Sequence, residues 1–301
     1  MKILFTFPGQ GGQRPGMLAA LPDREAILTQ ARAVLGDEVD TLDSADALQH
    51  TRAVQLCLLI AGVAWARELQ RQGVDPQMVS GLSIGAFPAA VIAGALDFAS
   101  ALRLVALRGD LMEQAYPEGY GLTAIMGLTR PRVEALMQGH DEVYLANLNA
   151  ETQFVIAGRD EAMAEVAQLT LRAGASKVQR LAVSVPSHCA LLDKPAAALA
   201  KAFADVTLTR PQRAYLSGSS ARVLWDPQRI ADDLAMNMAR PVHWQEAMVA
   251  ADERDARLAI EMPPGGVLTC LTRQAGWRGE TIALERSGLD VARHLAQRLS
   301  D

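Results

Sequence analysis

The sequence is poor in cysteine, has no excess of positive charge and contains no long apolar run. Its three cysteines form no CxxC pair and lack metal-ligand spacing, which argues against a disulfide scaffold and against a zinc site. So few cysteines fit a reducing compartment, and we expect a cytoplasmic protein without a bound metal. The net charge of −5 in 301 residues gives no indication of nucleic acid or an anionic membrane surface as a partner.

The sequence also lacks the patterns of a signal peptide and of a membrane span. The apolar run from Met1 to Phe7 is too short for a secretory leader and carries a single lysine. The longest apolar stretch, Leu56 to Ala66, has 11 residues, whereas a bilayer requires about 20. We therefore predict that this stretch is a buried helix.

Strand patterns alternate with helix patterns along most of the chain, which predicts an α/β fold with a mainly parallel sheet covered on both faces. Between Leu122 and Val185 the predicted order changes to strand, helix, strand, strand, helix, strand, which is typical of a ferredoxin-like unit. We expect residues 1–121 and 186–301 to form the catalytic subdomain and residues 122–185 to form a smaller insert. The predicted strands of the main sheet are Lys2 to Phe7, Gln77 to Ser80, Ala214 to Ser217, Arg257 to Glu261 and Thr281 to Leu284.

The segment Gly81-Leu82-Ser83-Ile84-Gly85 fits the pattern G-x-S-x-G and lies between a predicted strand and a predicted helix. A nucleophile on such a sharp turn has a strained backbone, and glycines two residues away let the chain pass. The Ile84 N–H and the helix dipole could then stabilise an oxyanion. The alternative is a tight turn or a helix N-cap serine, and the motif alone does not exclude it.

A serine nucleophile needs a base, and five histidines are available. We favour His188, because it follows Val183-Ser-Val-Pro-Ser187, where the insert ends and a helix to about Phe203 is predicted. That position could return it to the active edge of the sheet. The alternative is a helix-start histidine bonded to its own backbone.

Arg108 shares one face of a predicted helix, Ala99 to Ala115, with Leu104, Leu111 and Met112. An arginine on an apolar stripe is costly unless it is paired, and its planar guanidinium suits a carboxylate. A substrate carboxylate is one candidate partner. An internal ion pair or a side chain that reaches out to solvent is the alternative.

The glycine-rich segment Gly9-Gln10-Gly11-Gly12-Gln13 lacks the Gly-Lys-Ser/Thr ending of a P-loop and does not fit G-x-G-x-x-G. Nucleotide binding is therefore not expected. A glycine loop at the carboxyl end of a strand can instead bring backbone donors, or Gln10, close to a reacting carbonyl.

Four segments together resemble the malonyl-CoA:acyl-carrier-protein transacylase family, in the family's order and over nearly the whole chain. The most specific of them contains His188. The segments are Phe7-Pro-Gly-Gln-Gly-Gly-Gln13, the Ser83 turn, Ala106-Leu-Arg-Gly109 and Ser184-Val-Pro-Ser-His-Cys-Ala190.

The resemblance implies an α/β-hydrolase-like large subdomain with a ferredoxin-like insert, and an enzyme that loads malonyl from malonyl-CoA onto an acyl carrier protein without a bound cofactor. It implies no third acid, because a backbone carbonyl orients the histidine, and the loop Met262 to Gly266 is a candidate for it. The implied roles are nucleophile for Ser83, base for His188, oxyanion contacts for Gln10 and the Ile84 N–H, a malonyl carboxylate clamp for Arg108, and a place in the site lining for Gln55.

Two positions depart from the fatty-acid enzymes, which usually have histidine before the serine and glutamate after the second glycine. Here these positions are Leu82 and Ala86, and this turn more closely resembles the malonyltransferase subunit of malonate decarboxylase systems. We therefore favour a dedicated malonate decarboxylase carrier with a phosphopantetheine-type arm. The alternatives are fatty-acid or polyketide synthesis, a serine thioesterase or esterase, and a non-catalytic subunit that docks a carrier.

Overall fold

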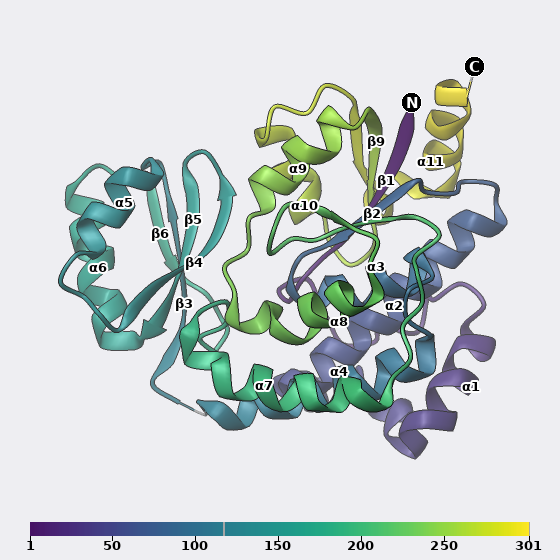
Figure 1. The fold of residues 1–301 in the computed structure, drawn as a ribbon, viewed down its shortest axis with the longest axis horizontal. Helices are drawn as coiled ribbons and strands as arrows, with labels where there is room; N and C mark the ends of the chain where they lie inside the picture. The colour runs from purple at the N-terminus through teal and green to yellow at the C-terminus, as the bar shows by residue number, and fades with distance from the viewer. Residues whose placement is uncertain (117, 301) are drawn as a thin grey trace.

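The protein is described by a computed structural model that covers residues 1–116 and 118–300 (Figure 1). Pro117 and Asp301, which belong to the predicted catalytic subdomain, lie outside the described residues. Two sheets are present, one of six strands in the order β10-β9-β1-β2-β7-β8 and one of four in the order β4-β5-β3-β6. The large sheet is formed by β1 (Lys2–Phe7), β2 (Met78–Gly81), β7 (Ala214–Leu216), β8 (Val223–Leu224), β9 (Ala256–Glu261) and β10 (Glu280–Ala283).

Helices cover both faces of the large sheet, because successive side chains of a strand point to opposite faces. Phe5 and Phe7 of β1 belong to the apolar core that includes α2, α3 and α4, whereas Leu4 packs in the core formed with α9 and α10. The helices outside the small sheet are α1 (Arg24–Leu35), α2 (Thr51–Arg71), α3 (Ala86–Ala93), α4 (Phe98–Ala115), α7 (Asp193–Ala202), α8 (Pro227–Met236), α9 (Trp244–Glu253), α10 (Val267–Gln274) and α11 (Leu284–Ser300).

The four-stranded sheet is antiparallel throughout and lies beside the large sheet (Figure 1). Its elements follow the order predicted from the sequence. They are β3 (Tyr120–Met126), α5 (Arg130–Met137), β4 (Val143–Ala150), β5 (Gln153–Arg159), α6 (Asp160–Arg172) and β6 (Lys177–Arg180).

The predicted α/β class is confirmed, with one difference in the large sheet. All strand pairs there are parallel except β7 with β8, which are antiparallel, so the sheet is mixed. β8 has only two residues and therefore carries no strand periodicity that a sequence pattern could show. The apolar run Leu56 to Ala66 lies inside α2 and is mostly buried. Among the described residues, no helix is long and apolar enough to cross a bilayer.

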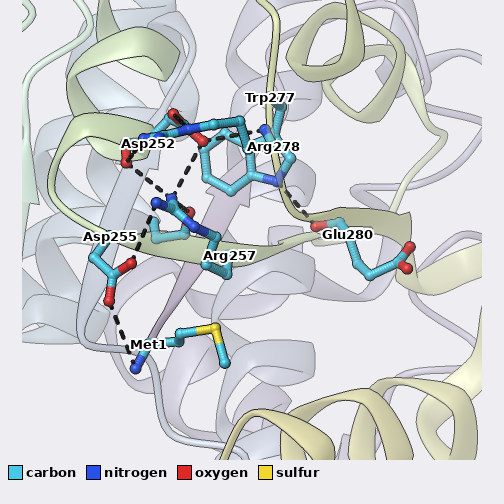
Figure 2. Close-up of polar contacts among 8 residues, drawn as sticks. Met1, Asp252, Asp255, Arg257, Trp277, Arg278 and Glu280 are labelled. Atoms are coloured by element: carbon cyan, nitrogen blue, oxygen red, sulfur yellow. Dashed lines mark hydrogen bonds and ion pairs between the residues drawn. The ribbon is translucent and has the colours of Figure 1, made fainter.

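A network of charged groups joins the strands of the large sheet at the end where β1 and β9 begin (Figure 2). The amino group of Met1 lies 3.7 Å from Asp255, whose carboxylate also lies 3.2 Å from Arg257. Asp252 accepts from Arg257 at 3.3 Å and from Arg278 at 2.6 Å. These contacts tie Met1 to the turn between α9 and β9, at the end of the strands opposite to their carboxyl ends.

Candidate functional site

Ser83 lies on a tight turn between β2 and α3, at the carboxyl end of the sheet. Its φ of 58° is in the left-handed region, which is strained for a residue with a side chain. A Cβ at Gly81 would lie 2.0 Å from the carbonyl of Gly85, and one at Gly85 would lie 2.1 Å from the Phe7 oxygen. The spacing of the two glycines is therefore dictated by this close packing. The predicted strand–turn–helix arrangement around the serine is present.

The glycine-rich loop after β1 packs directly against this turn. The Leu82 N–H donates to the Phe7 oxygen at 3.0 Å, and a Cβ on Gly9 would lie 3.8 Å from the Cβ of Ser83. Gln10, the next residue, is half-buried, and its side chain makes no hydrogen bond within the described part of the chain. The loop thus lies beside the serine, where the unbonded side chain of Gln10 can contact a substrate, whereas the Gly11 N–H already donates to the Gln13 Oε1 at 2.6 Å.

His188 is buried and meets Ser83 directly, with 2.9 Å between its Nε2 and the serine Oγ. Its Nδ1 lies 2.8 Å from the backbone oxygen of Asn237 and 3.2 Å from that of Arg240. Because carbonyl oxygens only accept, we assign the proton to Nδ1, which leaves Nε2 free to accept from the serine hydroxyl. The pair therefore has the geometry of a nucleophile and its base, with backbone carbonyls in place of a third acid.

Two details of the histidine prediction are wrong. His188 lies before the helix rather than at its start, because its φ of 65° is left-handed and α7 begins only at Asp193. The orienting carbonyls do not come from the loop Met262 to Gly266. That loop packs against the glycine-rich loop instead, where a Cβ on Gly12 would lie 3.1 Å from the Pro264 oxygen.

Arg108 on α4 is fully buried beside the serine. Its Nη2 donates to the Ser83 Oγ at 3.3 Å and to the Asn237 Oδ1 at 2.9 Å. Among the described residues, its Nε and Nη1 have no partner, and the predicted alternative of an internal ion pair is wrong. Burial lowers the pKa of Arg108 to about 9, so an anion entering this site would stabilise its charged form.

Gln55 on α2 is also buried close to the arginine's helix. Its Nε2 contacts the Met112 sulfur at 3.3 Å, while its Oε1 has no partner in the described structure. The two helices touch at the backbone, because a Cβ on Gly109 would lie 2.4 Å from the Arg52 Cα. An unpaired amide oxygen on α2 and two unpaired guanidinium nitrogens on α4 are thus buried on two helices that pack together, as expected of a polar ligand site.

Asn237 is the site residue that the sequence did not indicate. Its side chain accepts from Arg108 and donates to the Ser83 carbonyl at 3.3 Å, while its own carbonyl faces His188. It follows α8 in a short 3₁₀ turn, Asn237–Ala239. The sequence analysis singled out no motif around it, and its contact with His188 uses a backbone carbonyl that every residue has. Within the described residues, no cluster of His, Cys, Asp and Glu could hold a metal.

This chain is similar in sequence to known proteins over most of its length. The family model described as "Acyl transferase domain" matches residues 4–287. The malonyl CoA-acyl carrier protein transacylase of Escherichia coli K12 is 36% identical over 285 residues, which cover 91% of this chain and 92% of that protein.

Two solved structures extend the likeness to the fold. The malonyl CoA-acyl carrier protein transacylase from Coxiella burnetii matches with a TM-score of 0.92 and 31% identity, over 100% of this chain and 98% of its own. A malonyl-transacylase in complex with its type II polyketide synthase acyl-carrier protein matches with a TM-score of 0.91 and 34% identity, over 98% and 99%.

The fold and these matches define the chain as an acyltransferase. More particularly, it belongs to the malonyl-CoA–acyl carrier protein transacylase family.

Proposed function

We propose that this chain moves a malonyl group from malonyl-CoA to the phosphopantetheine-type thiol of an acyl carrier protein, through an ester on Ser83. The observation that carries this proposal is the hydroxyl of Ser83, which lies 2.9 Å from a buried imidazole and 3.3 Å from a buried guanidinium. The first contact suits acyl transfer, and the second suits an acyl group that bears a carboxylate. The names of the relatives agree with both.

In the first half-reaction, the Ser83 Oγ attacks the thioester carbonyl while His188 Nε2 takes the hydroxyl proton. The oxyanion of the tetrahedral intermediate lies against the Ile84 N–H and donors of Gln10. Collapse breaks the carbon–sulfur bond, and the proton on His188 passes to the departing thiolate of coenzyme A. In the second half, the carrier thiol gives its proton to His188, attacks the ester carbonyl, and Ser83 leaves with that proton. The charge of the imidazolium is stabilised by the Asn237 carbonyl.

The far end of the acyl group is held by Arg108. Its unpaired Nε and Nη1 offer N–H donors to the free carboxylate of malonyl, and the buried, unpaired Oε1 of Gln55 lies on the neighbouring helix α2. An acetyl group would leave the buried charge uncompensated, which is the physical basis for selecting malonyl.

We propose a carrier of fatty-acid or polyketide synthesis rather than one of malonate decarboxylase. Curated relatives in Escherichia coli and Bacillus subtilis, 36% and 32% identical, are named malonyl CoA-acyl carrier protein transacylases. The malonate decarboxylase prediction rested on Leu82 and Ala86 and has no support among these relatives. Leu82 instead packs into the apolar cluster around β7 and α9, and Ala86 is buried in the main core, so both have packing roles.

We also propose that residues 122–185 form a ferredoxin-like unit inserted into an α/β-hydrolase-like unit of residues 1–121 and 186–301. The strand order β4-β5-β3-β6 supports this division. So does the packing of α5 and α6, which place Val133 and Val166 in one apolar cluster with Ile125 and Ile156. The two helices therefore cover the same face of the small sheet.

Mass spectrometry tests the proposed intermediate. Malonyl-CoA without a carrier should leave a malonyl ester that peptide mapping places on Ser83. Addition of carrier protein bearing its thiol arm should remove the ester and malonylate the carrier, whereas the same carrier without the arm should not. Rapid loss of the ester to water would favour the thioesterase alternative, and no ester at all would favour a non-catalytic docking subunit. In competition, we expect a fatty-acid carrier to be loaded faster than a malonate decarboxylase carrier.

A second prediction concerns the pH dependence of acylation. Burial, and then the nearby charge of Arg108, lower the pKa of His188 from 6.5 to about 4. Since the neutral imidazole is the active base, kcat/KM for malonyl-CoA should stay near its plateau at pH 6 and fall only as the pH approaches 4 to 5. A single-turnover acylation series would measure this. An acid limb centred at pH 6.5 would contradict the buried base.

The lowered pKa of His188 also affects the stability of the folded protein. Stability must therefore be measured as a control for the acylation series. The folded protein holds its histidine proton less tightly than the unfolded chain does, so the contribution of His188 is present above pH 6.5 and is lost as the pH falls from 6.5 towards 4. Circular dichroism at each pH would therefore separate loss of the base from loss of the fold.

A further inference from the structure

The chain passes between the small sheet and the rest of the protein twice, and we call these two connecting segments the crossings. One side chain bonds to both of them. The chain enters at Tyr120 and leaves after Arg180, the last residue of β6. The Arg180 guanidinium donates to the Tyr120 carbonyl at 2.8 Å and to that of Leu122 at 3.3 Å on the entering strand. On the leaving segment it donates to the Val183 carbonyl at 2.9 Å and to that of Leu181.

The neighbouring residue types leave space for this guanidinium and hold it in place. A Cβ on Gly121 would lie 2.0 Å from the Arg180 Nη2, so only glycine leaves room for it there. The φ of Gly121 is not left-handed, so close approach rather than backbone conformation explains this glycine. Asp160 at the start of α6 holds the guanidinium with a contact of 2.9 Å. Backbone carbonyls otherwise occupy its donors, which makes Arg180 a bracket across the two crossings.

The segment held by this bracket leads straight to His188. Residues 181–187 contain no helix or strand, so they have no regular hydrogen-bond ladder to fix their path. At the far end, the His188 N–H donates to the Met238 carbonyl at 2.6 Å. Cys189 is buried against the small sheet in a cluster with Ala124 and Val155.

The small sheet also reaches the carbonyls that orient the imidazole. Leu148 of β4 donates to the Val242 carbonyl, and the Val242 N–H donates to the Ala146 carbonyl, both at 2.8 Å. Val242 lies two residues after Arg240, whose carbonyl faces the His188 Nδ1. Cys189, next to His188, and Val242, close to Arg240, are thus both attached to the small sheet.

We propose that Arg180 is a positioning residue for the reaction, and that its bracket across the two crossings fixes the small sheet and thereby the distance of His188 from Ser83. The proposal rests on the proposed role of His188 as the base. A base displaced by about 1 Å costs roughly a hundredfold in rate, even when substrate binding is intact.

The experiment compares Arg180→Gln, Gly121→Ala and the double variant. Arg180→Gln removes the bracket, and Gly121→Ala keeps the arginine but forces its guanidinium away. We expect each single variant to lower the single-turnover acylation rate by roughly 10- to 100-fold with KM for malonyl-CoA little changed. The double variant should be no worse than Arg180→Gln, because both changes act through the same contact. Arg180→Lys, with fewer donors, should fall in between.

The matched control is Arg130→Gln on α5, a helix that packs against the same small sheet, and it removes an exposed pair with Glu134 at 2.7 Å. It should leave the rate unchanged. The pH profile supplies a readout that a loss of stability alone would not move. A displaced His188 becomes more exposed, so its pKa and the acid limb of acylation should rise towards 6.5 in the Arg180 and Gly121 variants only.

The bracket variants change none of the groups that face the imidazole. A rise in the pKa of His188 in these variants would therefore come mainly from its exposure to solvent. Arg108 of α4 contributes charge, Ser83 a hydroxyl, and Asn237 and Arg240 carbonyls, and the bracket variants replace none of these residues. The Arg240 guanidinium is itself paired with Asp232.

Arg180 and Gly121 variants that keep the wild-type rate and acid limb would overturn the proposal, as would strictly additive losses in the double variant. Ser83→Ala and His188→Ala are measured in the same experiment. They distinguish failure of the bracket proposal from failure of the proposed function. If both are inactive while the bracket variants are normal, only the bracket is wrong; if both remain active, the proposed function fails first.

Discussion

Replacement of Ser83 by alanine is expected to reduce malonyl transfer by about a millionfold. The reason is chemical, because alanine has no oxygen to form the ester through which both half-reactions pass. The fold should tolerate the change. Ser83 has a left-handed backbone that alanine tolerates no worse, and the variant loses only contacts to Arg108 and His188.

The matched control for this variant is Ser80→Ala, three positions earlier on β2. The Ser80 hydroxyl is buried and donates to the Leu216 carbonyl at 2.9 Å, away from the imidazole. It should cost about 1 kcal/mol of stability and leave the transfer rate unchanged. Rates would be measured as radiolabelled malonyl appearing on the carrier. Full activity of Ser83→Ala would show that the ester is not an intermediate.

The sequence predicted the element order because hydrophobic periodicity follows directly from burial. It also predicted the Ser83 turn, since the two glycines are required by backbone contacts closer than any Cβ allows. Helix spacing placed Arg108 on a buried face, although only the structure shows that no acidic side chain in the described chain pairs with it.

Other features of the site could not be predicted from residue patterns. The carbonyls of Asn237 and Arg240 orient His188 through backbone atoms, which leave no mark on the choice of side chain. The malonate decarboxylase pathway was predicted from two residues of one turn, Leu82 and Ala86. Both side chains pack in apolar clusters, so the residue type at these positions is constrained by the core as well as by the substrate.

Replacement of Arg108 by methionine should lower the preference for malonyl-CoA over acetyl-CoA, measured as a ratio of kcat/KM values, by roughly 10- to 150-fold. This range corresponds to the loss of a charge-assisted contact of about 1.5–3 kcal/mol. Methionine keeps most of the side-chain volume in a position that is fully buried. The substitution should therefore remove the charge and the donors without opening a large cavity.

Acetyl-CoA serves as the internal reference, because Arg108 also contacts Ser83 and Asn237. If the arginine merely supported these neighbours, both substrates would lose rate equally and the ratio would not change. Arg103→Met on the same helix is the matched control, since its exposed guanidinium donates to the Ser100 hydroxyl and lies near the charge of Asp97 at the start of α4. An Arg108→Met enzyme that still prefers malonyl as strongly as the Arg103→Met enzyme would show that the carboxylate is recognised elsewhere. A fall confined to malonyl-CoA would assign the two unpaired guanidinium nitrogens to the substrate.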